Sequence, residues 1–231
     1  MTLSNSRILK PVAAIAVGAA LCAAILWKIA PATAGTGVTV PPAEMSLQGN
    51  ADQPQTVVLA GGCYWGMEEV FQHVKGVTDV VTGYAGGTRE HANYGDSSSG
   101  RYGDAEAVRI SYDPRKISYT DLLQIYFSVA HDPTQVNRQG PDVGPQYRSE
   151  IFAAGDGQAR VARAYIQQLD KAHVFDAPIA TKVGEHQNFF EAEAYMQDYA
   201  RRHPNSLYIM INDAPKVAAL KARFPQRYHD D

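Results

Sequence analysis

The fold is decided by the stretch Thr56-Val57-Val58-Leu59-Ala60-Gly61-Gly62-Cys63-Tyr64-Trp65-Gly66. Its β-branched first half is typical of a buried strand, and from residue 64 to 75 apolar residues recur at helical spacing. Cys63 is therefore predicted in a glycine-rich turn at the start of a helix. The unpaired N–H groups and the positive dipole end of that helix favour a thiolate, the nucleophilic form of cysteine. A buried, inert cysteine is the alternative.

Outward from this turn, the chain mixes strands and helices without strict βαβ alternation. Apolar or alternating segments predict strands at 77–84, 105–112, 148–153 and 179–183. Helical spacing predicts helices at 118–129, 157–173 and 188–202. Two long loops, 88–103 and 131–147, resemble ordered functional loops in length and composition. The predicted fold class is α+β, with one mixed sheet and helices packed against it.

The first 34 residues have the order of an export signal. Two basic residues, Arg7 and Lys10, precede an apolar run at 12–27, and small residues ending at Ala34 follow it. This is the order of a cleaved signal peptide. A retained signal anchor is the other interpretation, although the run is shorter than the about 20 residues of a typical span. In either case we expect the folded part to be periplasmic or anchored to the membrane by residues 12–27.

Charge and cysteine content narrow the function. The net charge of −3 becomes −6 without residues 1–34, because that segment holds three basic residues and no acidic one. This balance argues against a nucleic-acid partner. Loss of the segment also removes Cys22 and leaves Cys63 alone, so the domain cannot depend on disulfides. A reactive role is the interpretation that a single exported thiol favours.

Composition divides the remaining chain into three parts. Residues 35–54 are rich in Gly, Thr, Pro, Ala and Gln without periodicity, and we interpret them as a flexible tether. Residues 55–205 hold the predicted strands and helices and form the expected catalytic domain. Residues 206–231 are expected to be a mostly irregular tail, with a helical turn or two around 217–222, and they contain no cysteine.

Several motifs follow one another along residues 55–205. They are Gly62-Cys63-Tyr64-Trp65-Gly66, Gly83-Tyr84-Ala85-Gly86-Gly87, Gly103-Asp104-Ala105-Glu106, His131-Asp132-Pro133 and Asn137-Arg138-Gln139-Gly140-Pro141-Asp142-Val143-Gly144-Pro145-Gln146-Tyr147-Arg148-Ser149. In these motifs and their order the chain resembles the peptide methionine sulfoxide reductase A family. The resemblance implies a two-layer α/β sandwich and thiol-dependent reduction of methionine S-sulfoxide, in proteins and as the free amino acid.

The resemblance also implies roles for individual residues. Cys63 attacks the sulfoxide sulfur and becomes a sulfenic acid. Glu106 donates a proton to the sulfoxide oxygen, which requires that burial raise its pKa. Tyr94 and Tyr147 donate hydroxyl hydrogen bonds to the same oxygen without bringing charge.

Substrate binding and recycling follow from the same resemblance. Tyr64 and Trp65 correspond to the aromatic pair that receives the S-methyl group, and Asp142 to a polar partner near the site. No metal and no bound cofactor are implied. The expected partners are oxidised proteins and peptides, and an external thiol, either a thioredoxin-like protein or a dithiol. The expected function is repair of oxidised exported proteins.

The chain departs from the family pattern at several places. Tyr64 stands where Phe is commoner, which adds a hydroxyl. Asp104 stands where the family usually has His, and this second carboxylate would either raise the pKa of Glu106 or face solvent. The tail lacks the resolving cysteine that many relatives carry, so we expect an external thiol to attack Cys63 directly.

Two other functions are open to a chain with this turn. One is a cysteine hydrolase that uses Cys63 with His131 or His186 as base. The other is a non-catalytic module that holds exposed methionines against the aromatic pair. Otherwise His131, His186 and His203 are interpreted as structural or surface residues. Turnover of a methyl sulfoxide with a dithiol separates these functions from the reductase.

Overall fold

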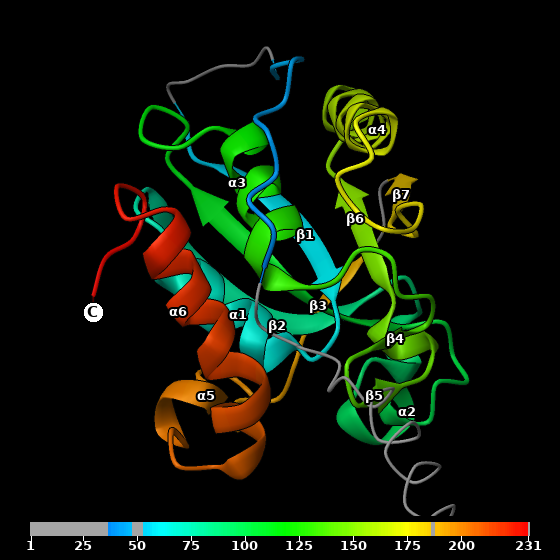
Figure 1. The fold of residues 1–231 in the computed structure, drawn as a ribbon. Helices are drawn as coiled ribbons and strands as arrows, with labels where there is room; N and C mark the ends of the chain where they lie inside the picture. The colour runs from blue at the N-terminus through cyan, green and yellow to red at the C-terminus, as the bar shows by residue number, and fades with distance from the viewer. Residues whose placement is uncertain (1–36, 48–52, 186–187, 231) are drawn as a thin grey trace, which may run out of the picture. The chain divides into compact units, whose positions relative to one another are not determined.

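The computed structural model describes residues 37–47, 53–185 and 188–230. Residues 34–231 form one compact unit, and the unit 1–33 lies outside the described residues. The larger unit contains a six-stranded sheet in the order β7-β6-β1-β3-β2-β8 (Figure 1). Its strands are β1 Gln55–Gly61, β2 Val77–Ala85, β3 Ala105–Tyr112, β6 Ser149–Ala153, β7 Lys182–Glu185 and β8 Phe189–Glu191. Neighbouring strands are antiparallel except β6 and β7, which are parallel, so the sheet is mixed as predicted.

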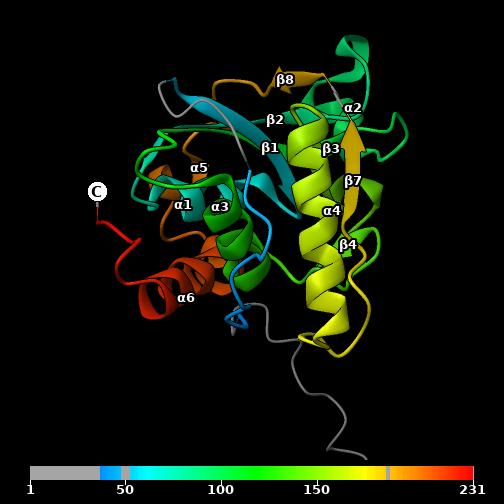
Figure 2. The ribbon, with the colours of Figure 1, turned by 90° about the horizontal axis from the view of Figure 1, so that it is seen from above.

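Helices cover one face of this sheet. The longer ones are α1 Tyr64–Gln72, α3 Tyr119–Ile125, α4 Asp156–Lys171 and α6 Ala214–Arg223. Figure 2 shows α4 running alongside β7, while α1, α3 and α6 gather over the central strands. The shorter elements are α2 Tyr94–Ser98, α5 Tyr199–Arg202, η1 Arg89–His91, η2 Tyr126–Ala130, η3 Pro145–Tyr147, η4 Ile209–Asp213, and the small ribbon of β4 Arg138–Gln139 with β5 Asp142–Val143.

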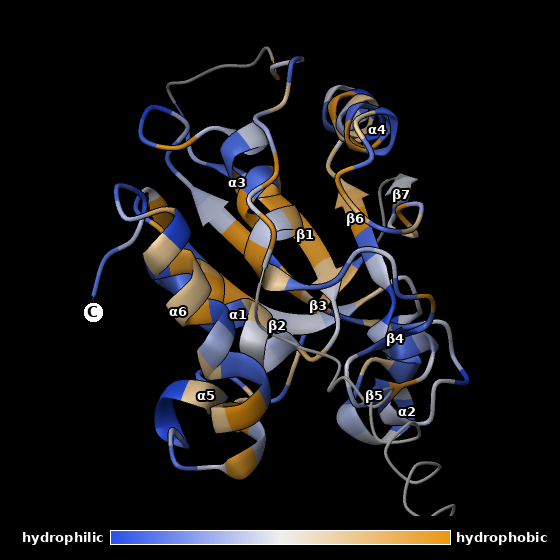
Figure 3. Cartoon of the chain, viewed as in Figure 1, coloured by the Kyte–Doolittle hydropathy of each residue, from blue (hydrophilic) through white to orange (hydrophobic). Residues whose placement is uncertain are grey.

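Alternation along the strands places the apolar core on one face of the sheet, and the Glu106 carboxyl extends from that same face. On β3, Val108 and Ile110 face the helices and join Leu59 of β1 in the main apolar cluster. Ala105 and Ala107 face the other way. Figure 3 shows the apolar character of β1 and α3 against the polar loops near β4. Burial of each large apolar side chain contributes about 1.5–3 kcal/mol, so this face defines the fold.

The predicted helix at 188–202 is wrong. Its first residues form β8, which pairs with β2 opposite Gly83 to Ala85. A Cβ on Gly83 would lie 2.3 Å from the carbonyl oxygen of Phe190, so the glycine admits this close strand. The chain then turns and reaches only the four-residue α5. Pairing with a distant strand has overridden the local helical pattern.

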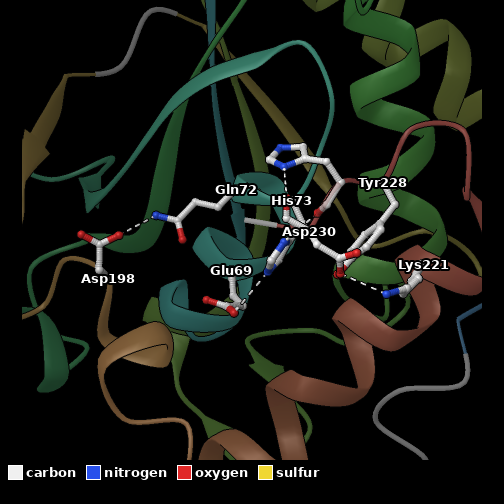
Figure 4. Close-up of polar contacts among 8 residues, drawn as sticks. Glu69, Gln72, His73, Asp198, Lys221, Tyr228 and Asp230 are labelled. Carbon is white, nitrogen blue, oxygen red and sulfur yellow. Dashed lines mark hydrogen bonds and ion pairs between the residues drawn. The ribbon is translucent and has the colours of Figure 1, made fainter.

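The tail is ordered and helical where the sequence predicts mostly irregular structure. η4 and α6 cover residues 209–223, and Pro215 lies in the first turn of α6, where its missing N–H is tolerated. Leu220 is fully buried. The end of the chain is fixed to the end of α1, where Nδ1 of His73 lies 3.0 Å from the carbonyl oxygen of His229. Figure 4 shows His73 beside Tyr228 and Asp230. The tail is therefore part of the folded domain.

Residues 37–47 lie against the domain, within the segment that the sequence predicts to be a tether. Val40 is buried and its N–H donates to Oγ of Ser128 at 3.2 Å. The Tyr165 hydroxyl donates to the carbonyl oxygen of Pro41 at 2.6 Å. Apolar contact and backbone hydrogen bonds thus hold this part as an extended arm. Residues 35–36 and 48–52 of the predicted tether are outside the described residues.

In the part of the chain that the structure describes, no helix has the length and apolar character needed to cross a membrane. The predicted signal or anchor at 1–34 lies outside that part and stays a prediction.

Candidate active site

Cys63 occupies the turn that the sequence predicts. β1 ends at Gly61, and Cys63 is the N-cap residue of α1. Gly62 has φ +94°, and a Cβ there would lie 2.5 Å from Cγ of Gln139, so both conformation and space require glycine. The turn leaves the Cys63 side chain 7% exposed beside the first N–H groups of the helix.

Glu106 lies at the same helix start. It extends from the helix-covered face of β3, is 3% exposed, and its Oε2 accepts the N–H of Tyr64 at 3.1 Å. Burial raises the pKa of Glu106 to about 8; the Tyr64 N–H opposes this, and the negative charges of Asp142 and Asp213 add to it. The carboxyl therefore retains a proton near neutral pH.

The Cys63 thiol is also protonated in this buried site. Burial raises the pKa of Cys63 well above its ordinary value, and the charges of Glu106 and Asp213 raise it further. A hydrogen bond from the Trp65 N–H and the charge of Lys216 lower it. The helix start thus favours the thiolate as predicted, but loss of water outweighs that effect. At neutral pH the Cys63 thiol and the Glu106 carboxyl are therefore both protonated.

The two predicted tyrosine donors come from separate loops. Tyr147 ends η3 and is half-buried; burial, together with Glu106, Asp142 and Cys63, raises its pKa. Tyr94 begins α2 and is 41% exposed. Tyr147 is within electrostatic range of Glu106 and Cys63, and Tyr94 is within range of Tyr147.

Glu193 holds the Tyr94 loop in place. Its Oε1 accepts the Tyr94 N–H and its Oε2 accepts the hydroxyl of Tyr84, each at 3.0 Å. Because Tyr84 pairs with Glu106 across β2 and β3, this clamp joins the Tyr94 loop to the strand that carries the carboxyl. Glu193 was not predicted as a site residue, since the sequence placed it in a helix.

Arg148 fastens the Tyr147 loop. Its guanidinium donates to Glu150 at 2.7 Å and to the carbonyl oxygens of Gly103 and Asp104 at 3.0 and 3.2 Å. The residue next to Tyr147 is thereby tied to the entry of β3, two residues before Glu106. Charge-assisted hydrogen bonds of this kind are the stronger ones in proteins.

The aromatic pair has further partners from the C-terminal part of the chain. The Trp65 ring stacks on Tyr199 at 3.8 Å between centroids and meets the edge of Tyr208 at 5.9 Å. Tyr64 is fully buried, and its hydroxyl lies 3.5 Å from that of Tyr84. The hydroxyl that distinguishes Tyr64 from Phe is therefore enclosed by protein.

Asp142 lies beside this cluster. The Tyr208 hydroxyl donates to its Oδ2 at 2.5 Å, and burial raises the Asp142 pKa while Tyr208 and Lys216 lower it. Tyr199, Tyr208, Asp213 and Lys216 are site neighbours that the sequence interpretation missed. The signal available for the last two was Asp213-Ala214-Pro215 followed by apolar residues at helical spacing, which predicts a helix start in the tail.

Asp104 does not face solvent. It is 3% exposed, and burial raises its pKa, while the Gly87 N–H, Arg148 and His91 lower it. The like charges that raise the pKa of Glu106 belong instead to Asp142 and Asp213. Of the two interpretations of this departure, solvent exposure is wrong, and Asp104 is not among the charges that raise the pKa of Glu106.

A cysteine hydrolase would use a histidine as the base for Cys63, so the state of the histidines tests that alternative. Burial lowers the pKa of His131 to about 3, and its Nδ1 faces the carbonyl oxygen of Tyr126 at 3.1 Å. His203 is exposed and stacks on Tyr199. Both have the structural or surface character predicted for them, and His186 lies outside the described residues. Among the residues that the structure describes, no group of three or more His, Cys, Asp or Glu could hold a metal ion.

Glu106→Gln should stabilise the domain in alkali. The carboxyl has its ordinary pKa of 4.5 when unfolded and about 8 when folded, so its contribution to stability declines as pH rises between those values. One pKa unit is about 1.4 kcal/mol, so the amide should gain a few kcal/mol over the wild type above pH 8 and little at pH 4. Thermal unfolding at pH 4, 6 and 9 measures this. Glu90→Gln, at an exposed position, is the control, and an equal difference at all three pH values would contradict the account.

Comparisons with known proteins all lead to one family. The family model for peptide methionine sulfoxide reductase matches residues 55–228, so it continues past the predicted boundary at 205 into the tail. Peptide methionine sulfoxide reductase MsrA 2 of Mesorhizobium japonicum is 53% identical over 176 residues, covering 76% of this chain and 90% of that protein. The protein of the same name from Synechocystis is 50% identical, covering 76% and 80%.

Two solved structures share the fold. Mxr1 of Saccharomyces cerevisiae in reduced form superposes with a TM-score of 0.59 at 31% identity, over 69% of this chain and 91% of that one. Methionine sulfoxide reductase A of Corynebacterium diphtheriae gives 0.57 at 31% identity, over 72% and 84%. The predicted fold and enzyme class are confirmed. The chain belongs to the peptide methionine sulfoxide reductase family.

Proposed function

We propose that this reductase takes the S epimer of methionine sulfoxide and passes through a sulfenic acid on Cys63. The observation that carries the proposal is the buried Glu106 carboxyl, protonated up to about pH 8 and bonded to the helix start that Cys63 caps. A sulfoxide sulfur becomes electrophilic when its oxygen is protonated or strongly hydrogen-bonded, and this carboxyl is a proton donor beside the nucleophile.

The reduction step balances without a metal or cofactor. The Cys63 sulfur attacks the sulfoxide sulfur while Glu106 donates its proton to the oxygen, and the proton that the Cys63 thiol gives up restores the Glu106 carboxyl. The sulfur–oxygen bond breaks and the oxygen passes to Cys63 as a sulfenic acid. Methionine sulfur is reduced by two electrons and the Cys63 sulfur is oxidised by two. The uncharged phenols of Tyr94 and Tyr147 donate hydrogen bonds to the same oxygen.

Recycling requires an external thiol. No cysteine follows Cys63 in the sequence, so an attacking thiol must come from a dithiol or a thioredoxin-like protein. That thiol forms a mixed disulfide with Cys63 and releases water, and a second thiol restores the Cys63 thiol. The S-methyl group of the substrate would lie against the aromatic pair of Tyr64 and Trp65. Tyr199 and Tyr208 pack against Trp65. Asp142, bonded to Tyr208, would be the polar partner near the site.

We further propose that the substrates are oxidised proteins outside the cytoplasm, as well as peptides and free methionine sulfoxide. The signal-like order of residues 1–34 supports this location, either periplasmic or membrane-anchored. N-terminal sequencing of native protein distinguishes a cleaved signal from a retained anchor.

Epimer selectivity tests the proposed activity. With dithiothreitol as reductant, the enzyme should convert methionine S-sulfoxide, free and in a peptide, and leave the R epimer unchanged. Chiral chromatography of the remaining sulfoxide measures this. Equal loss of both epimers, or loss of R alone, would overturn the assignment. A cysteine hydrolase or a binding module would convert neither.

A further inference from the structure

Asp213 and Lys216, both from the C-terminal tail, form a buried ion pair. Nζ of Lys216 lies 3.1 Å from Oδ1 of Asp213, and the two side chains are 9% and 0% exposed. Among the residues that the structure describes, none donates a hydrogen bond to the second, buried carboxylate oxygen of Asp213. Buried ion pairs are costly to desolvate, and apolar residues of similar size would often give equal or greater stability. Stability alone therefore does not explain this pair.

Gly66 makes room for the pair in the first turn of the helix that Cys63 caps. A Cβ on Gly66 would lie 2.0 Å from Oδ1 of Asp213 and 2.8 Å from Nζ of Lys216. The absence of that atom lets both charged groups approach the backbone of α1. Gly66 lies three residues after Cys63, in the first turn of the helix that Cys63 caps. Charges this close in a buried site act on their neighbours with little screening.

We propose that Asp213 and Lys216 are a positioning pair for Cys63, in which the ammonium favours the thiolate and the carboxylate opposes it. The proposal rests on the proposed role of Cys63 as nucleophile. Neither side chain takes part in the chemical step; each acts through the charge it holds next to the sulfur. Two residues of the C-terminal tail thereby explain why the Cys63 motif ends in a glycine, Gly66.

The charges around the thiol agree with these opposite effects. After burial, which is the largest cause, Glu106 and Asp213 raise the pKa of Cys63 and Lys216 lowers it. Asp213 also raises the pKa of Glu106. Asp213 thus acts on both groups that hold the two protons of the site, and Lys216 acts on the thiol.

Groups on several other elements face the same sulfur. The charge of a Cys63 thiolate raises the pKa of Tyr147 in η3 and of Tyr208 at the start of η4. The charge of Asp142 in β5 raises the pKa of Glu106. His131 is neutral near Lys216. Of the charged groups that act on Cys63 in the described part of the chain, Lys216 supplies the positive one. Its removal should therefore make the Cys63 thiolate less favourable, because no other positive charge among the described residues would compensate.

The reactivity of Cys63 tests the proposal. The full chain with Cys22→Ser has Cys63 as its one cysteine, and alkylation by iodoacetamide is followed by mass spectrometry from pH 6 to 10. Because a thiolate fraction changes tenfold per pKa unit, Lys216→Met should slow alkylation at pH 8 roughly tenfold and Asp213→Asn should speed it roughly tenfold. Lys216→Arg should retain the wild-type profile.

Lys221→Met is the matched control. Lys221 lies on the same helix, is exposed, and pairs with Asp230 at 3.0 Å, as Figure 4 shows. Its loss should leave the alkylation profile unchanged. Shifts of the same direction in Lys216→Met and Asp213→Asn, or no shift in either, would overturn the proposal, because a merely structural role predicts no opposition of sign.

A second comparison covers the case in which Lys216→Met does not fold. Adding Lys216→Met to Asp213→Asn leaves no unpaired buried charge, and it should slow alkylation relative to Asp213→Asn alone. An unchanged rate would overturn the proposal. Since the assay contains no sulfoxide, its failure is distinct from failure of the proposed function, which appears in the epimer assay.

Discussion

Replacing Cys63 by Ser should abolish reduction of methionine sulfoxide while leaving the domain folded. Serine is a good N-cap residue, so the start of α1 should be retained or slightly stabilised. Its hydroxyl is a weak nucleophile without an adjacent base. Glu106, at the same helix start, holds its proton up to about pH 8 and cannot serve as that base at neutral pH.

The measurement is methionine formed in a single turnover from the S-sulfoxide, together with thermal unfolding of the same sample. Cys22→Ser is the matched control and should retain full activity, because Cys22 precedes the folded domain. Residual turnover well above the uncatalysed reaction in Cys63→Ser would remove Cys63 from the mechanism.

Replacing Glu106 by Gln should slow the reduction step by roughly 10²–10⁴, the usual contribution of a general acid. The amide keeps the shape and can accept the Tyr64 N–H, but it cannot supply a proton to the departing oxygen. The pH profile of kcat/KM should show an ionisation near 8 in the wild type that is absent in the variant. Substrate binding should change little.

Tyr147→Phe is the comparison for this prediction. Its effect should be smaller, because the hydroxyl of Tyr94 remains to donate to the same oxygen. Rapid quenching gives the single-turnover rate for each variant. A Glu106→Gln enzyme with the wild-type rate, or one that retains the ionisation near 8, would show that another group supplies the proton.

Local sequence was sufficient for the centre of the fold. The β-branched run before Gly61 and the apolar spacing after Cys63 predicted β1, the turn and α1, and alternation in β3 placed Glu106 on the face of Val108 and Ile110. These patterns hold because each is enforced by burial on one face of a strand or helix. The family resemblance then related Glu106 to Cys63, which are 43 positions apart.

The chain from residue 188 onward could not be predicted in the same way. Phe189 and Phe190 fit a helical pattern, but pairing with β2 decides their structure, and that pairing depends on Gly83 far upstream. Asp213 and Lys216 look like surface charges in the sequence, because charged residues are almost never fully buried. Asp213 and Lys216 are recognised as neighbours of the thiol only in the folded structure, where the tail packs against Gly66.

The most direct measurement is the chemical state of Cys63 after one turnover with methionine S-sulfoxide and no reductant. The account predicts one dimedone adduct per chain, on Cys63, and none after incubation with the R epimer. A disulfide between Cys63 and another residue of the chain, or methionine formed with no sulfenic acid on Cys63, would contradict it.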